Sequence, residues 1–273
     1  MEHSLWRRET GWLRPVPRRP QAAVRTLRSH AALIDPGGAI VGLREAVPTA
    51  IDGCDPEGVH TLRVQTRRLI VFLQLAGRRA LIDDLRWVRS AAAEVRDLDV
   101  LIQRTLPDEI RVWFAQQRDA AQAHLRHALE CSRTQGLLEA LEWLEPVSID
   151  CAQGELVRLR RLVARRGEDL AQVDDDPHRE RLRLHDLRRA LRRLRYTLAW
   201  VGNDPPRLRR LQNALGGMND VEQFAIRLLE YPERARVIEL ITDVEARAAA
   251  AQAACMTAWE DARDEIEALA FDS

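Results

Sequence analysis

Apolar residues recur at intervals of three and four along almost the whole chain from about residue 21 onward. This spacing is that of one face of an α-helix, and runs that alternate apolar and polar residues, as half-buried strands do, are missing. The pattern therefore predicts an all-α protein. Its helices are expected at about residues 39–52, 57–77, 81–104, 108–145, 152–172, 177–201, 206–230 and 233–270.

Three Asp-Pro pairs mark helix starts, because Asp accepts a backbone N–H at the N-cap and Pro fits the first helical position. They are Asp55-Pro56, Asp176-Pro177 and Asp204-Pro205. Four helices joined by short loops in each half predict two up-and-down four-helix bundles, half one at about 39–145 and half two at about 150–270. Residues 1–38 are expected to form a basic, proline-containing extension that is partly flexible.

One helical pattern occurs twice, at residues 59–69 and at residues 184–196. Six of the ten positions from His60 to Leu69 are identical to those from His185 to Leu194. Unrelated helices of this composition match at on the order of one position, so the chain contains an internal repeat. The two bundles are therefore predicted to be similar and to pack about a pseudo-twofold axis.

Both copies place a histidine and several arginines on one side of the helix and leucines on the other. On the polar side of the second copy lie His185, Arg188, Arg189, Arg192, Arg195 and Tyr196, and on that of the first lie His60, Arg63 and Arg67. Arginines that face the same way repel one another unless an anion lies between them. A chain that builds this face twice is predicted to bind a polyanion.

The net charge of the chain does not favour such binding, because 42 basic residues balance 42 acidic ones. Every basic residue is arginine, and the arginines are locally concentrated: residues 178–196 contain eight of them against two acids. Zero net charge and an aromatic content of 5% argue against nucleic acid as the ligand. The polyanion site must therefore come from local segregation of charge.

The four cysteines, Cys54, Cys131, Cys151 and Cys255, show no paired short spacing, which argues against a zinc site or a redox pair. They are expected to be reduced thiols in a cytoplasmic protein. No apolar run is long enough for a signal peptide or a membrane span, so no membrane association is expected.

The repeat continues beyond the arginine helix, where Arg96-Asp97 aligns with Asn219-Asp220. The histidine and arginine helices, RDLDV at Arg96–Val100 and LQNALGGMND at Leu211–Asp220 together resemble the CHAD family, the conserved histidine α-helical domain. The similarity covers roughly residues 39–270. It implies two four-helix bundles whose basic helices line a central groove or pore that binds inorganic polyphosphate, and it suggests targeting to polyphosphate granules.

Carried over position by position and combined with the polar helix face, the resemblance implies a set of polyphosphate-binding residues. They are His60, Arg63, Arg67, Arg68, Arg86, Arg89, His185, Arg188, Arg189, Arg192, Arg193 and Arg209. Gln212 stands where the first half has Arg89, so the two half-sites are expected to be unequal. Asp97 and Asp220 are expected to orient arginines through salt bridges, and each histidine either packs between the bundles or donates to phosphate.

The main alternative is a metal-dependent phosphohydrolase that uses His60, His185, Asp186 and Asp220 as ligands. Arginines crowd the same helix face, and Thr61 replaces the Asp in the first copy, which disfavours a metal there. A nucleic-acid-binding protein is the other alternative. The sequence favours a non-enzymatic polyphosphate-binding protein that uses no metal, no cofactor and no catalytic residue.

Overall fold

The computed structural model describes residues 32–171 and 176–269, which belong to one compact unit that begins at Ala32. Most of the predicted N-terminal extension, residues 1–31, lies outside the described residues. The described ranges are helical almost throughout and contain no helix that is both long enough and apolar enough to cross a bilayer. The predicted all-α class is confirmed.

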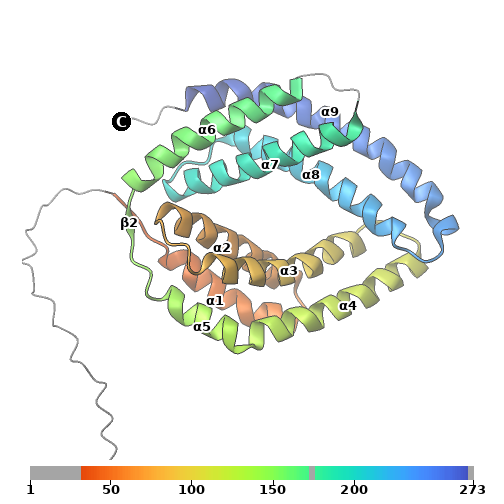
Figure 1. Cartoon of the computed structure of the whole chain (residues 1–273). Coiled ribbons are helices and arrows are strands. Elements are labelled where there is room, and N and C mark those ends of the chain that lie inside the picture. Colours follow the sequence, from red (N-terminus) through yellow and green to blue (C-terminus); the bar gives the residue numbers. More distant parts are fainter. Residues whose placement is uncertain (1–31, 172–175, 270–273) are drawn as a thin grey trace, which may run out of the picture. The chain divides into compact units, whose positions relative to one another are not determined.

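The first half contains α1 (Gly37–Asp52), α2 (Pro56–Leu75), α3 (Ile82–Ile102), α4 (Asp108–Glu130) and α5 (Ser132–Leu141). The second half contains α6 (Asp150–Ala171), α7 (Pro177–Trp200), α8 (Pro206–Leu229), the 3-10 helix η1 (Arg234–Val237) and α9 (Ile238–Ala268). Figure 1 shows α2 and α3 of the first half facing α7 and α8 of the second.

Each half is a four-helix bundle in which successive helices are neighbours and the first helix contacts the last. The order of contacts is α1, α2, α3, α4 and back to α1 in the first bundle, and α6, α7, α8, α9 and back to α6 in the second. Between the bundles, α2 contacts α7 and α6. The two bundles thus share one order of contacts, and the pseudo-twofold axis stays a prediction.

The leucine faces predicted from the repeat form the two bundle cores. Leu62, Leu69 and Leu73 of α2 are completely buried. Leu187, Leu191, Leu194 and Leu198 of α7 are completely buried as well. Burying a leucine side chain contributes about 1.5–3 kcal/mol, so these faces fix which side of each helix is left for the arginines.

One expected helix, over residues 108–145, is wrong, because the chain breaks at Cys131 into α4 and α5. Cys131 has extended backbone angles (φ −75°, ψ 157°), and the Thr134 hydroxyl donates to the Ala128 carbonyl, 2.7 Å away. This local bond satisfies a carbonyl at the end of α4 and turns the chain. The shorter α5 then packs against α1, α3 and α4.

Two short strands were not predicted from the sequence. β1 (Leu33–Ile34) pairs antiparallel with β2 (Val147–Ser148), with Leu33 opposite Ser148. Two residues are too few to show an alternating pattern. The pair ties the segment before α1 to the connection between the two halves.

The Asp-Pro signals gave mixed results. Asp55 caps α2 by accepting from the Glu57 N–H at 2.8 Å, as predicted. Asp204 does not cap α8, whose N-cap position is Pro205. Glu265 of α9 instead accepts from the Arg207 and Leu208 N–H groups at 3.1 and 3.3 Å, a tertiary cap that no local pattern encodes.

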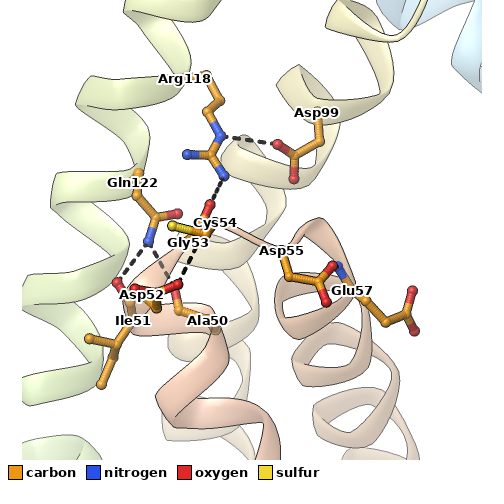
Figure 2. A network of polar contacts seen from close by, with 10 residues as sticks. All are labelled: Ala50, Ile51, Asp52, Gly53, Cys54, Asp55, Glu57, Asp99, Arg118 and Gln122. Carbon is orange, nitrogen blue, oxygen red and sulfur yellow. Dashed lines mark hydrogen bonds and ion pairs between the residues drawn. The ribbon is translucent and has the colours of Figure 1, made fainter.

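A polar network holds the turn between α1 and α2 against α3 and α4 (Figure 2). Gly53 ends α1 with a left-handed backbone (φ 74°), and a Cβ there would lie 2.4 Å from the Gln122 side chain. Gln122 donates to the Ala50 and Ile51 carbonyls. Arg118 donates to the Gly53 carbonyl and forms an ion pair at 3.0 Å with the buried Asp99 carboxylate.

Replacing Arg118 by Met is expected to lower the free energy of unfolding by about 3 kcal/mol, because it leaves the Asp99 carboxylate buried and unpaired. Urea denaturation measures this loss. The double variant with Arg118→Met and Asp99→Asn is the control, since it removes the buried charge and should recover part of the stability. Equal losses in the single and double variants would contradict this role for the ion pair.

Candidate anion-binding site

A cavity of about 460 Å³ lies between the two bundles, and we call it the central pocket. It is lined from both halves, by α2 and α3 on one side and by α7 and α8 on the other. Its lining residues are His60, Arg63, Val64, Arg67, Arg96, Asp97, Val100, Arg188, Arg192, Gln212, Asn213, Gly216, Gly217 and Asp220. The buried leucine faces turn the opposite sides of α2 and α7 toward this space.

Positive charge dominates the central pocket, where the described lining includes five arginines and two carboxylates. Arg63 lies 3.6 Å from the Asp97 carboxylate and also donates to the Ala92 carbonyl. Arg188 donates to the side-chain oxygen of Asn219. Arg67, Arg96 and Arg192 form no ion pair with any described residue.

Two N–H donors in the central pocket lack an acceptor among the described residues. The Nε atoms of Arg67 and Arg188 are buried and have no hydrogen-bond partner among the described residues. The only hydrogen bond from the Arg67 side chain within those residues goes to the Tyr196 hydroxyl at 3.3 Å, whose ring Arg67 also covers. Buried donors without acceptors are costly, and the oxygens of a bound anion would satisfy them.

Burial lowers the pKa of Arg192 to about 9, and the positive charges of Arg67 and Arg188 act in the same direction. Burial likewise lowers the pKa of Arg63 and of Arg188. Arg192 therefore stays charged at neutral pH, but the folded state holds its proton less tightly than the unfolded state. This destabilises the fold at every pH below about 9, and the loss is recovered as the pH rises above that value.

The two carboxylates of the central pocket behave differently. Burial raises the pKa of Asp97, the negative charge of Asp220 raises it further, and Arg63 opposes both effects. The predicted salt bridge to Asp97 is confirmed by its ion pair with Arg63. The carboxylate of Asp220 forms no ion pair with the described residues, but its negative charge opposes the lowering of the Arg188 pKa by burial. Its backbone carbonyl accepts from Arg104. A salt bridge of Asp220 stays a prediction.

Of the twelve residues predicted from sequence, five line the central pocket: His60, Arg63, Arg67, Arg188 and Arg192. Arg89 is close enough to Arg67 for that charge to help lower its pKa, after burial, the larger cause. The roles of these residues in ligand binding stay predictions.

The other six predicted residues are engaged outside the lining of the central pocket. Arg68 lies over the Trp200 ring, with its guanidinium carbon 5.1 Å from the ring centre. Arg86 pairs with Asp83, and Arg209 pairs with Asp204. Arg189 and Arg193 pair with Asp186 and Glu155 on the α6 side of α7.

His185 is the sixth, and it distinguishes the two copies of the repeat. Its Nε2 lies 2.9 Å from the Glu222 carboxylate of α8. This contact lies within the second bundle, so packing between the bundles and donation to phosphate both stay predictions for this histidine. His60 lines the central pocket instead. The aligned histidines therefore have different surroundings.

Sequence reasoning omitted one arginine of the central pocket, Arg96. The sequence did point to this position, because Arg96-Asp97 aligns with Asn219-Asp220 in the repeat. Gly216 and Gly217 were also missed as lining residues. A Cβ at either glycine would meet no atom within 4 Å, so these positions add open space beside the arginines.

The ligand set of the metal-dependent alternative is not assembled. His60 and Asp220 line the central pocket, whereas His185 pairs with Glu222, and Asp186 pairs with Arg166 and Arg189. Over residues 32–171 and 176–269, no three His, Cys, Asp or Glu side chains converge in a way that would hold a metal ion. The four residues proposed as ligands therefore do not form one site.

Comparisons with known proteins agree on one fold. The model of the CHAD domain family matches residues 38–228. The crystal structure of the CHAD domain from the plant Ricinus communis superimposes with a TM-score of 0.67 at 23% identity, covering 87% of this chain and 91% of that chain. PptA from Streptomyces chartreusis gives a TM-score of 0.65 at 18% identity, covering 82% and 96%. No curated protein sequence gives a significant match.

Replacing Arg192 by Met is expected to stabilise the ligand-free protein, because it removes a poorly compensated charge while keeping a long side chain. The expected gain is about 1 kcal/mol, which raises the Tm by roughly 2–4 °C in a chain of this size. Calorimetric melting measures it, with Arg161→Met on exposed α6 as the control that leaves the Tm unchanged. A lower Tm for Arg192→Met would show that its charge is well compensated.

Proposed function

The chain belongs to the CHAD domain family, and from that premise we propose that it binds inorganic polyphosphate in the central pocket and does not hydrolyse it. The observation that carries the proposal is the convergence of five arginines from α2, α3 and α7 on one cavity with only two carboxylates, counted over the described residues. Like charges held this close favour a ligand that is itself a dense anion.

Polyphosphate suits this site because it carries about one negative charge per phosphate and has no base to stack. Sites for single-stranded nucleic acid combine basic residues with aromatic platforms. No aromatic side chain is among the described residues that line the central pocket. Tyr196 lies beside it, but Arg67 covers its ring. The lining therefore supports polyphosphate over RNA.

Both bundles contribute to the proposed site, which makes the ligand a bridge between them. Arg63 and Arg67 come from α2, and Arg188 and Arg192 come from α7, two helices that contact each other between the bundles. A chain of phosphates that contacts both helices neutralises charge on each side. We further propose that this binding brings the protein to polyphosphate granules.

Binding without hydrolysis is the part of the proposal that concerns chemistry. Cleavage of a phosphoanhydride bond needs groups that activate water and stabilise the leaving phosphate. Of the two carboxylates in the described lining, Asp97 is engaged by Arg63, and Asp220 faces the positive charge of Arg188. This arrangement supports donation of hydrogen bonds to a bound anion.

Calorimetric titration with long-chain polyphosphate, beside single-stranded RNA of matched charge, tests the ligand class. We expect polyphosphate to bind more tightly. The paired substitutions Arg63→Ala with Arg67→Ala, and Arg188→Ala with Arg192→Ala, should each weaken binding by about 3 kcal/mol, roughly a hundredfold in Kd, because charge-assisted contacts are lost while neighbouring arginines compensate in part.

The matched control carries Arg247→Ala and Arg263→Ala on α9, which removes the same charge from exposed positions. It should leave the affinity nearly unchanged. Equal affinity for RNA would contradict the ligand class. If one pair of substitutions leaves the affinity unchanged while the other abolishes binding, the site is not shared by both bundles.

Release of phosphate from polyphosphate in the presence of magnesium or manganese tests the absence of hydrolysis. The purified protein is expected to release none above the background without protein, and Asp220→Ala should leave that result unchanged. Metal-dependent release that disappears in Asp220→Ala would show that the central pocket is catalytic.

A further inference from the structure

A second basic cavity lies on the other side of α7, between α7 and α6, and we call it the outer groove. Its volume is about 290 Å³, and it shares no lining residue with the central pocket within the described ranges. It is lined by Leu159, Leu162, Arg166, Asp186, Arg189, Ala190 and Arg193. Two of these residues, Arg189 and Arg193, are arginines that the sequence analysis expected in the polyphosphate site.

Shared carboxylates pair the three arginines of the outer groove with one another or with Arg158, which lies next to the lining residue Leu159 in the chain. Asp186 accepts from Arg189 and lies 3.4 Å from Arg166. The carboxylate oxygens of Glu155 lie 2.6 Å from a guanidinium nitrogen of Arg193 and 2.8 Å from one of Arg158. A guanidinium has five N–H donors, and pairing with a shared carboxylate uses only some of them. The carboxylates thus fix the guanidiniums and leave donors for another anion.

The charge at the outer groove stays positive after the ion pairs between described residues are counted. Four arginines face Asp186, Glu155 and Asp169, which lies 3.6 Å from Arg166. Arg161 and Arg165 follow on exposed turns of α6 and form no ion pair with the described residues. An oxyanion would therefore meet net positive charge along this side of α6 and α7.

Helix geometry places the outer groove beside the central pocket. Arg188 and Arg192 point into the central pocket, whereas Arg189 and Arg193, each one position later, line the outer groove. Consecutive positions are about 100° apart, so the arginines of α7 wrap around one side of the helix. Arg189 lines the outer groove and is 77% exposed.

We propose that the outer groove is a second phosphate subsite, occupied by the same polyphosphate chain after it leaves the central pocket and crosses α7. This inference rests on the proposed function and extends it to chain-length preference. A long chain engages both cavities and gains affinity from the second set of contacts without a second association step. A short chain occupies the central pocket alone.

The test compares tripolyphosphate with long-chain polyphosphate on a variant that carries Arg158→Ala and Arg166→Ala. This choice leaves Arg193 with Glu155 and Arg189 with Asp186, so neither carboxylate loses its last partner. We expect the Kd for long-chain polyphosphate to rise about tenfold, and its slope of log K against log salt to become shallower by about one to two units. The Kd for tripolyphosphate should change less than about twofold, because no contact in the central pocket is altered.

The α9 variant with Arg247→Ala and Arg263→Ala is again the matched control, and thermal melting confirms that both variants fold. If the variant with Arg158→Ala and Arg166→Ala binds the long chain with unchanged affinity, the outer groove is not a phosphate subsite. The proposed site in the central pocket would not be affected by that result. Failure of the unaltered protein to bind either ligand would overturn the proposed function itself.

The outer groove could instead bind a separate small phosphate ligand of its own. A variant of the central pocket with Arg67→Ala and Arg192→Ala distinguishes this case from one chain that occupies both cavities. If one chain occupies both cavities, tripolyphosphate binding to this variant is lost. If tripolyphosphate still binds there and is released by adding Arg158→Ala and Arg166→Ala, the outer groove is an independent site and the single-chain proposal is wrong.

Discussion

The constraint that shapes this structure is the positive charge of the central pocket, which the two carboxylates of its described lining do not balance. Guanidiniums from α2, α3 and α7 face one another across the central pocket, and three of them form no ion pair with the described residues. Desolvation and mutual repulsion oppose this arrangement. It persists because two leucine-packed bundles fix the backbones of α2 and α7, with completely buried leucines on the sides away from the pocket. The stability of the cores offsets the electrostatic cost of the site.

Much of this arrangement follows from the sequence. The spacing of leucines and arginines on residues 59–69 and 184–196 predicts both the helices and their polar faces, since a helix with buried leucines on one side must present its arginines on the other. The repeat predicts that two such faces exist. Five of the predicted residues line the central pocket for that reason, and Arg96 was within reach through its alignment with Asn219.

Other features depend on tertiary contacts that no local pattern records. The polar face of α7 spans a wide arc, and only the packing of α2 against α7 decides that Arg192 lies in the central pocket and Arg193 beside α6. The cap of α8 comes from Glu265, which is more than fifty residues away in the chain. The break at Cys131 depends on one hydroxyl group, that of Thr134, and helical periodicity continues across it.

The most direct test of the central claim is a crystal structure of the protein with bound polyphosphate. The account predicts phosphate oxygens within about 2.7–2.9 Å of guanidinium nitrogens in the central pocket, the usual length of a charge-assisted hydrogen bond. Arg67, Arg96 and Arg192 should be among the contacts, because they have no other anionic partner among the described residues. A polyphosphate chain bound elsewhere, with these three guanidiniums free of phosphate, would contradict the claim.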